Sequence, residues 1–256
     1  MIDIHCHILP NLDDGPKKMD DCLKMAVAAV DAGITDLFAT PHHMNGQFEN
    51  SKIVILERVN ELNQYLSNEK IPLTIHPGQE LRLHREIFHS IEIEEVVTLD
   101  NKGKFLLLEL PSSEVPNYTH DVIYELLLKG ITPIIVHPER NKRLLEDHNL
   151  LFEMVQGGAL IQITSGSIIG HFGKKIKAFS EKIIEHNLAH FIATDAHNTS
   201  SRGFTLHRAY EAITKKFGIN CTYYFRENAE LLLSGQTVIR EVPSSMVKKI
   251  LGFYWL

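Results

Sequence analysis

Short apolar runs alternate with longer amphipathic segments along most of the chain. The apolar runs predict β-strands at residues 2–6, 34–40, 72–76, 104–110, 131–136, 159–163 and 190–194. The segments between them repeat apolar residues at helical spacing and predict helices near 17–32, 50–68, 118–129, 148–156, 172–187 and 203–217. In the first of these helices, Leu23, Val27 and Val30 recur at that spacing. Pro16 lies at its start and Gly33 at its end, where each residue type is favoured.

The alternation of strand and helix predicts an α/β fold with a parallel sheet covered by helices. Seven strands without an obvious linker favour a closed or nearly closed barrel, and an open doubly wound sheet is the alternative. Barrels of this length form one unit, so residues 1–256 are expected to be a single domain. Residues 77–103 are less regular and suggest an insertion or lid. The tail 240–256 is basic and aromatic, and we expect it to dock on the domain, with partner or surface binding as the alternative.

Composition narrows the class of protein further. Hydrophobic residues at 44% and charged residues at 23% are ordinary for a soluble globular protein, and the net charge of −6 without a basic stripe argues against nucleic acid. Three widely spaced cysteines predict no disulfide framework and fit a reducing, cytoplasmic compartment. We see no signal peptide and no apolar run of about 18 residues, so no transmembrane helix is expected.

Histidines and carboxylates gather where the predicted strands end. Proline marks several of these ends, because it cannot donate to a sheet ladder: Thr40-Pro41-His42, His76-Pro77-Gly78, Glu109-Leu110-Pro111 and His137-Pro138-Glu139. In α/β barrels the reactive residues come from the carboxyl ends of the strands. The coincidence predicts a rim of metal ligands.

The first and last predicted strands carry the same spacing of ligand-type residues, His5 with His7 and Asp195 with His197. Residues two apart in a strand point to one face, roughly 6.5–7 Å apart, so each pair can reach one point. Two such pairs suggest a polynuclear metal site, and a hydrogen-bonded histidine pair is the alternative.

Strand alternation also assigns the faces of the first strand. It predicts that Ile2, Ile4 and Cys6 share the face toward the helices. Asp3 would then share the interior face with the two histidines, where polar groups need partners.

Four further residues at strand ends are candidate ligands. We favour His42 over His43, because adjacent side chains of an extended segment face opposite ways. Glu80 follows the third strand, where a solvated loop glutamate is the alternative. Glu109 closes an apolar run, where a salt bridge is the alternative. His137 closes the run at 134–136.

Two arginines are expected at the same rim. Arg140 lies three residues after His137, and Arg202 lies five residues after His197. A guanidinium beside metal cations is unfavourable unless anions offset it, and phosphate oxygens fit its planar fork. The arrangement favours a phosphate-binding role, with a rim salt bridge as the alternative for each.

Together these motifs resemble the PHP (polymerase and histidinol phosphatase) superfamily of metal-dependent phosphoesterases. The resemblance rests on Asp3-Ile-His5-Cys-His7, Asp13-Asp14-Gly15, Thr40-Pro41-His42-His43, Gly78-Gln79-Glu80, Leu108-Glu109, His137-Pro138-Glu139-Arg140 and Asp195-Ala196-His197. Asn228-Ala229-Glu230-Leu231-Leu232 resembles the closing helix of that superfamily. Ile8-Leu9-Pro10 before the Asp-Asp-Gly motif is similar to the manganese-dependent protein-tyrosine phosphatases of Gram-positive capsule and exopolysaccharide gene clusters.

The resemblance implies a distorted (β/α)7 TIM-like barrel with up to three metal ions, Mn²⁺ foremost, with Fe or Zn admitted by the mixed ligands. It implies one ion at His5, His7, Glu80 and Asp195. Glu80 would bridge to a second ion held with Glu109 and His137. Asp14, His42 and His197 would hold a third, whereas Asp13 is expected to cap the helix or shape a turn. Arg140 and Arg202 would bind phosphate.

The implied reaction is hydrolysis of phosphotyrosine on a protein, foremost the cognate bacterial tyrosine kinase. No Cys-x5-Arg loop of the thiol-based phosphatases occurs in the sequence. The alternatives are histidinol-phosphate phosphatase, a metal-dependent amidohydrolase or deaminase, and a non-catalytic, metal-stabilised binding module. The oligomeric state is left open.

Overall fold

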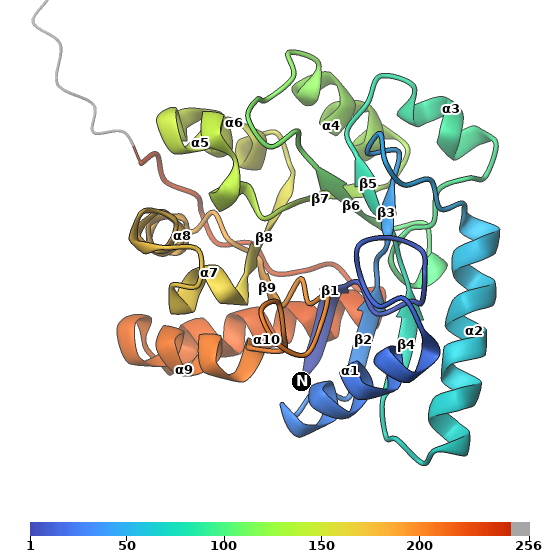
Figure 1. Cartoon of the computed structure of the whole chain (residues 1–256). Helices are drawn as coiled ribbons and strands as arrows, with labels where there is room; N and C mark the ends of the chain where they lie inside the picture. Colours follow the sequence, from blue (N-terminus) through green and yellow to red (C-terminus); the bar gives the residue numbers. More distant parts are fainter. Residues whose placement is uncertain (247–256) are drawn as a thin grey trace, which may run out of the picture.

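The computed structural model describes residues 1–246 as two parallel sheets surrounded by helices (Figure 1). The smaller sheet has the order β1 (Ile2–Cys6), β2 (Asp36–Ala39), β4 (Thr74–Pro77). The larger sheet has the order β3 (His42–His43), β5 (Glu80–Arg82), β6 (Phe105–Glu109), β7 (Thr132–Val136), β8 (Leu160–Thr164), β9 (Phe191–Ala193). Every neighbouring pair of these strands is parallel, which confirms the predicted α/β class.

All six predicted helices are confirmed: α1 (Met19–Asp31), α2 (Lys52–Asn68), α4 (Thr119–Leu128), α6 (His148–Gln156), α8 (Lys174–Glu185) and α9 (Leu206–Phe217). The prediction omitted α3 (Ile87–Glu92), α5 (Lys142–Glu146), α7 (Ser165–Ile169), α10 (Ile219–Leu233) and the 3₁₀ turns η1 (Leu99–Asn101) and η2 (Pro138–Arg140). The resemblance had located only the last part of α10. The irregular segment 77–103 holds β5, α3 and η1 between β4 and β6.

Two apolar clusters hold the strands in place. The larger cluster packs the outward faces of the strands against α1, α2, α4, α6, α8 and α9. The smaller one, which we call the inner cluster, joins residues of both sheets with α10. Its fully buried members include Ile4 and Phe38 of the smaller sheet and Leu107, Ile134 and Leu160 of the larger. The inner cluster therefore fixes the two sheets against each other below the edge where the strands end.

The alternation predicted for β1 is wrong, because the strand contains an irregularity. Asp3 pairs with Leu37 and Cys6 with Ala39, so Ile4 and His5 together face one residue of β2. Such a bulge places two successive side chains on the same side. Ile4 accordingly joins the inner cluster, whereas Cys6 joins the cluster under the helices. Asp3 does not accompany the histidines but accepts hydrogen bonds from the backbone N–H and hydroxyl of Thr194.

The described part of the C-terminal tail docks on the domain, as predicted. The backbone N–H of Ser244 donates to the carbonyl of His186 at 2.9 Å, and the side chain of Asn187 donates to the carbonyl of Val242 at 3.1 Å. Residues 247–256, which carry most of the predicted basic and aromatic character, lie outside the described residues. Among residues 1–246 no helix combines the length and apolarity needed to cross a membrane.

The inner cluster generates a stability prediction. Replacing the fully buried Phe38 with Ala leaves a cavity where the two sheets meet, so we expect unfolding to become easier by about 3–5 kcal/mol. Urea denaturation followed by circular dichroism measures the change. Tyr223→Ala, at a residue 56% exposed on α10, is the matched control and should change stability by less than about 0.5 kcal/mol. Equal stability of the two variants would contradict the role of the inner cluster.

Candidate metal centre

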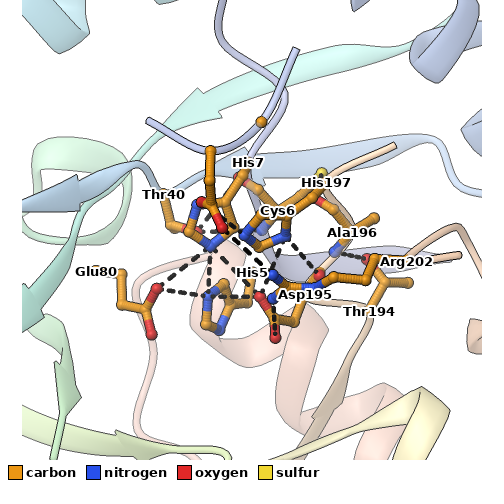
Figure 2. A network of polar contacts seen from close by, with 12 residues as sticks. His5, Cys6, His7, Thr40, Glu80, Thr194, Asp195, Ala196, His197 and Arg202 are labelled. Carbon is orange, nitrogen blue, oxygen red and sulfur yellow. Dashed lines mark hydrogen bonds and ion pairs between the residues drawn. The ribbon is translucent and has the colours of Figure 1, made fainter. Parts of the chain in front are cut away.

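The predicted site residues lie in or after parallel strands of both sheets, at the ends of those strands. Figure 2 shows part of the cluster, with the side chains of His5, His7, Glu80, Asp195, His197 and Arg202 gathered in one place. His5 lies in β1 and His7 just after it, while Asp195 and His197 follow β9. Backbone hydrogen bonds join these two ends: Asp195 donates to the carbonyl of His5, and His7 to the carbonyl of Ala196, each at 2.9 Å. His42 lies in β3, Glu80 in β5 and Glu109 in β6, and His137 follows β7. Residues up to 192 positions apart therefore meet.

Four buried donor atoms form the tightest group in the site. The Nε2 atoms of His5 and His7 lie 3.2 Å apart. Oε2 of Glu80 lies 3.4 and 3.3 Å from these nitrogens, and Oδ1 of Asp195 lies 3.6 and 3.4 Å from them. Adjacent ligands of one first-row metal ion, with bonds of about 2.0–2.2 Å, lie roughly 3.0–3.6 Å apart. The four atoms are thus spaced as the ligands of a single ion would be.

Glu80 links this group to further donors. Its other oxygen, Oε1, lies 2.7 Å from Nε2 of His137. Its Oε2 also lies 2.9 Å from Nδ1 of His42, which in turn lies 3.8 Å from Oε2 of Glu109. Donor atoms of His42, Glu80 and Glu109 all lie within 4.8 Å of one another and could hold an ion.

A third group lies on the other side of His42. Oδ1 of Asp14 lies 3.1 Å from Nε2 of His197 and 3.6 Å from Nε2 of His42. Together with His7, these residues offer donor atoms within 4.8 Å of one another. His42 therefore presents a different ring nitrogen to each of two groups, while the rings of His7 and His197 stack at 3.8 Å between centroids.

Four of these donor atoms are buried and make no hydrogen bond of acceptable geometry within the described chain: Nδ1 of His42, Oε2 of Glu80, Oδ1 of Asp195 and Nε2 of His197. Buried polar atoms are almost always satisfied, because leaving one unpaired is costly. Metal cations would satisfy all of these atoms at once. The residues present therefore fit a polynuclear metal centre with mixed nitrogen and oxygen ligands.

Neighbouring acceptors orient three of the histidines for coordination. Nδ1 of His7 donates to Oδ2 of Asp13 at 2.6 Å, and Nδ1 of His5 lies 2.9 Å from Oε1 of Gln162. Nδ1 of His197 donates to a backbone carbonyl at 2.9 Å. With Nδ1 protonated, the neutral ring keeps the Nε2 lone pair directed into the site, as metal binding requires.

Electrostatics favour the coordinating forms of several groups. Burial alone would raise the pKa of Glu80, but the surrounding histidines outweigh it and hold that pKa well below its usual range. Burial also works against ionisation of Asp195, yet Arg140 and the histidines keep its pKa well below the ordinary value. Burial lowers the pKa of His137 and of His197 to about 4, so both rings stay neutral at pH 7. Neutral imidazoles and ionised carboxylates are the metal-binding forms.

The pKa values of Glu109 and His7 are also shifted, because many ionisable groups lie close together in this site. Burial and the nearby Glu80 carboxylate raise the pKa of Glu109 to about 7. Burial opposes protonation of His7, but Asp13 and the other carboxylates raise its pKa well above the usual value. Protons and metal ions therefore compete for the same atoms in this site.

Backbone strain is present at two of the candidate ligands. His137 has a φ of +36° and Asp195 a φ of +53°, both in the left-handed region. Such conformations cost about 1–3 kcal/mol for a residue with a Cβ and persist where the surroundings impose them. Each strained residue lies just after a strand and turns its side chain toward the shared site.

Both predicted arginines contact the same carboxylate oxygen of the site. Arg140 and Arg202 place Nη2 at 2.8 and 2.9 Å from Oδ2 of Asp195, the oxygen that does not belong to the four-atom group. Arg202 also lies 3.5 Å from Oδ2 of Asp14. The two guanidinium groups therefore converge beside the candidate ligands, where they could bind the oxygens of an anion.

The sequence did not point to two contributors, Arg82 and Gln162, whereas its predictions for Asp13 and His43 agree with the structure. Arg82 contacts Oε2 of Glu109 at 2.8 Å, and its spacing of two from Glu80 in a strand could have revealed it. Gln162 carried no local signal. Asp13 shapes a turn by accepting from the N–H of Gly15 at 2.9 Å, as predicted, but it also orients His7. Nδ1 of His43, the residue disfavoured as a ligand, accepts a hydrogen bond from the N–H of Asn50 at 3.0 Å.

Fold and site together define a parallel α/β protein with a cluster of candidate metal ligands at its strand ends. The chain belongs to the capsular polysaccharide synthesis CpsB/CapC family, which it matches over residues 1–234. It is 45% identical to the tyrosine-protein phosphatase YwqE of Bacillus subtilis, covering 99% of this chain and all of the relative. It is 30% identical to the tyrosine-protein phosphatase CpsB of Streptococcus agalactiae serotype V, covering 93% of this chain and all of that protein.

Comparison with solved structures supports the same family membership. A chain from the crystal structures of YwqE from B. subtilis and CpsB from Streptococcus pneumoniae, described as unique metal-dependent tyrosine phosphatases, superposes with a TM-score of 0.94 at 44% identity. The match covers 97% of this chain and all of that one. A histidinol phosphate phosphatase from Lactococcus lactis shares the fold at a TM-score of 0.52 and 14% identity, over 87% of this chain and 94% of that one.

The contact between Asp13 and His7 yields a prediction about metal affinity. Asp13→Asn removes the charge that holds the ring of His7, so we expect metal affinity to fall by about tenfold to a hundredfold with the fold intact. Competition of bound metal with a chelating dye measures the affinity, and circular dichroism checks the fold. Asp20→Asn, on the exposed surface of α1, is the control. Identical affinities of Asp13→Asn and the unchanged protein would exclude this role.

Proposed function

We propose that this protein is a metal-dependent protein-tyrosine phosphatase, which hydrolyses phosphotyrosine monoesters on proteins. The observation that carries the proposal is the convergence of unpaired histidine and carboxylate donors with two arginines at one strand edge. The full-length similarity to YwqE and CpsB, both named tyrosine-protein phosphatases, supports the same substrate class.

We assign the ligands in three groups that share residues. His5, His7, Glu80 and Asp195 would hold one ion, Glu80 with Glu109 and His137 a second, and Asp14, His42 and His197 a third. Mn²⁺ suits this mixture of imidazole and carboxylate, and Fe or Zn are the alternatives. When bound, such ions lower the pKa of water toward neutrality and neutralise charge on phosphoryl oxygens.

The chain's own arginines would bind and orient the phosphate. Arg140 and Arg202 both contact Oδ2 of Asp195, and each guanidinium has further N–H groups that can donate to phosphate oxygens. Their positive charge stabilises the phosphoryl group as its charge redistributes during transfer. Tyrosine leaves as a phenolate with a pKa of about 10, so the reaction makes only a modest demand for a general acid.

The cysteines are poor candidates for a nucleophile. Burial raises the pKa of Cys6 well above its usual value, that of Cys22 to about 12 and that of Cys221 to about 11. Thiols with such pKa values stay protonated at neutral pH and attack phosphorus poorly. The thiol chemistry of other tyrosine phosphatases therefore does not suit this chain.

Histidinol-phosphate phosphatase is the less favoured function. The relative with that activity shares only the fold, at 14% identity, whereas the named tyrosine phosphatases match along nearly the whole chain. A non-catalytic binding module is disfavoured by the number of candidate ligands and by the two arginines that point at the site.

We infer that residues 1–256 form one domain and that the two sheets make up a distorted (β/α)7 barrel. The bridge between Cys6 and Ala196 and the inner cluster shared by both sheets support this. The physiological substrate would be a tyrosine-phosphorylated protein, foremost the cognate bacterial tyrosine kinase. The free cysteines suit a cytoplasmic location.

Chelation tests the proposed function directly. The purified protein should release phosphate from a phosphotyrosine peptide, lose that activity when a strong chelator removes its metals, and recover it when Mn²⁺ is added. Phosphate release is measured before and after each step, with histidinol phosphate as a parallel substrate. Activity that survives complete removal of metal, or a preference for histidinol phosphate, would refute the proposal.

Arg140 should act on substrate more than on metal. We expect Arg140→Ala to lower kcat/KM for the phosphotyrosine peptide by about a hundredfold, because one charged hydrogen-bonding group is lost from the transition state. Metal content, measured by elemental analysis, should stay the same. Arg143→Ala, at an exposed arginine paired with Asp147, serves as the control and should retain full activity. Unchanged kinetics in Arg140→Ala would remove this residue from the site.

A further inference from the structure

Two neighbouring hollows lead away from the candidate metal centre along α1. The inner hollow, about 300 Å³, is lined by the candidate ligands Asp14 and His197 and by the first turns of α1. The outer hollow, about 520 Å³, is lined by the apolar residues Leu23, Val27, Ala28 and Ile71 among others. Both are lined by Lys24 and Thr199, so the two hollows adjoin, and together we call them the α1 groove.

The α1 groove changes character along its length. Near the centre it is polar, and Lys24 pairs there with Asp21 at 2.8 Å. At its far end apolar surface predominates, because Val27 exposes 46% of its surface beside Leu23 and Ile71, although Asp31 and Glu69 also line this hollow. An exposed apolar surface that continues from a reaction centre is typical of a place where a partner lies.

We propose that the α1 groove binds the polypeptide that flanks the phosphotyrosine of a protein substrate, with an apolar side chain packed on Val27. The proposal rests on the proposed function and names where the rest of the substrate lies. A phosphotyrosine that reaches the metal centre brings its own main chain to the mouth of the site, and the α1 groove begins at that mouth. A separate hollow, lined by Glu109, His137 and Arg140 among others, measures only about 100 Å³ and offers less room for a chain.

The dimensions give the position of the apolar contact. From Met19, at the start of α1, to Val27 the helix rises roughly 12 Å, at 1.5 Å per residue. An extended peptide covers about 3.3 Å per residue. That rise corresponds to about four residues of extended chain, so the apolar residue of the substrate should lie at least four positions from the phosphotyrosine.

The test compares a long and a small substrate on the metal-loaded, full-length protein. The long substrate is a phosphotyrosine peptide with leucine five positions away on both sides, and the small one is 4-nitrophenyl phosphate. Val27→Asp should raise KM for the peptide on the order of fivefold to tenfold, because one apolar contact is lost. The kinetics with 4-nitrophenyl phosphate should not change. Leu128→Asp, at a residue 69% exposed on α4 and outside the groove, is the matched control.

A second substitution, in the peptide, makes the test specific for the contact. Replacing both leucines with serine should raise KM for the unchanged protein but should have no further effect in Val27→Asp, because both changes remove one contact. The proposed groove would be wrong if the unchanged protein and Val27→Asp gave equal KM values for the leucine peptide. It would also be wrong if Val27→Asp changed the kinetics of the peptide and of 4-nitrophenyl phosphate by the same factor. Hydrolysis of 4-nitrophenyl phosphate without any effect of Val27→Asp on the peptide rejects the groove alone. Failure of the metal-loaded protein on both substrates rejects the proposed function as well.

Discussion

The crowding of unpaired lone pairs around Glu80 is the constraint on which the rest of the structure depends. This fully buried carboxylate lies within 3.4 Å of nitrogens from His5, His7, His42 and His137. Its Oε2 makes no hydrogen bond within the described chain, and neither does Oδ1 of Asp195 nearby. So many donors in a buried site are unfavourable unless cations occupy the space between them. The same feature that weakens the metal-free protein therefore prepares it to bind metal.

The fold supplies this arrangement through its parallel strands. Strands that run the same way end at one edge, so each contributes its last side chain to the same place. The bulge in β1 allows Ile4 to pack in the inner cluster while His5, the next residue, faces the centre. Strained backbone at His137 and Asp195 turns two more side chains inward. The apolar packing beneath the edge thus stabilises the conformations that the site requires.

The sequence predicted most of this, and its failures have physical causes. Long periodic segments such as α2 and apolar runs such as β6 were found, because burial imposes their pattern. The short strands β3 and β5 were missed, since two or three residues show no period. The bulge in β1 could not be read from alternation alone. The candidate ligands were located because strand ends and prolines mark them, whereas Gln162 orients His5 from 157 positions away without any local signal.

The central claim is that the buried donors around Glu80 are ligands of metal ions. Anomalous diffraction from crystals grown with Mn²⁺ measures this most directly, because it locates the ions independently of any assay. The account predicts anomalous peaks between the side chains of His5, His7, Glu80 and Asp195 and in the two adjoining groups. A fully loaded crystal whose peaks all lie elsewhere, with these side chains unchanged, would contradict it.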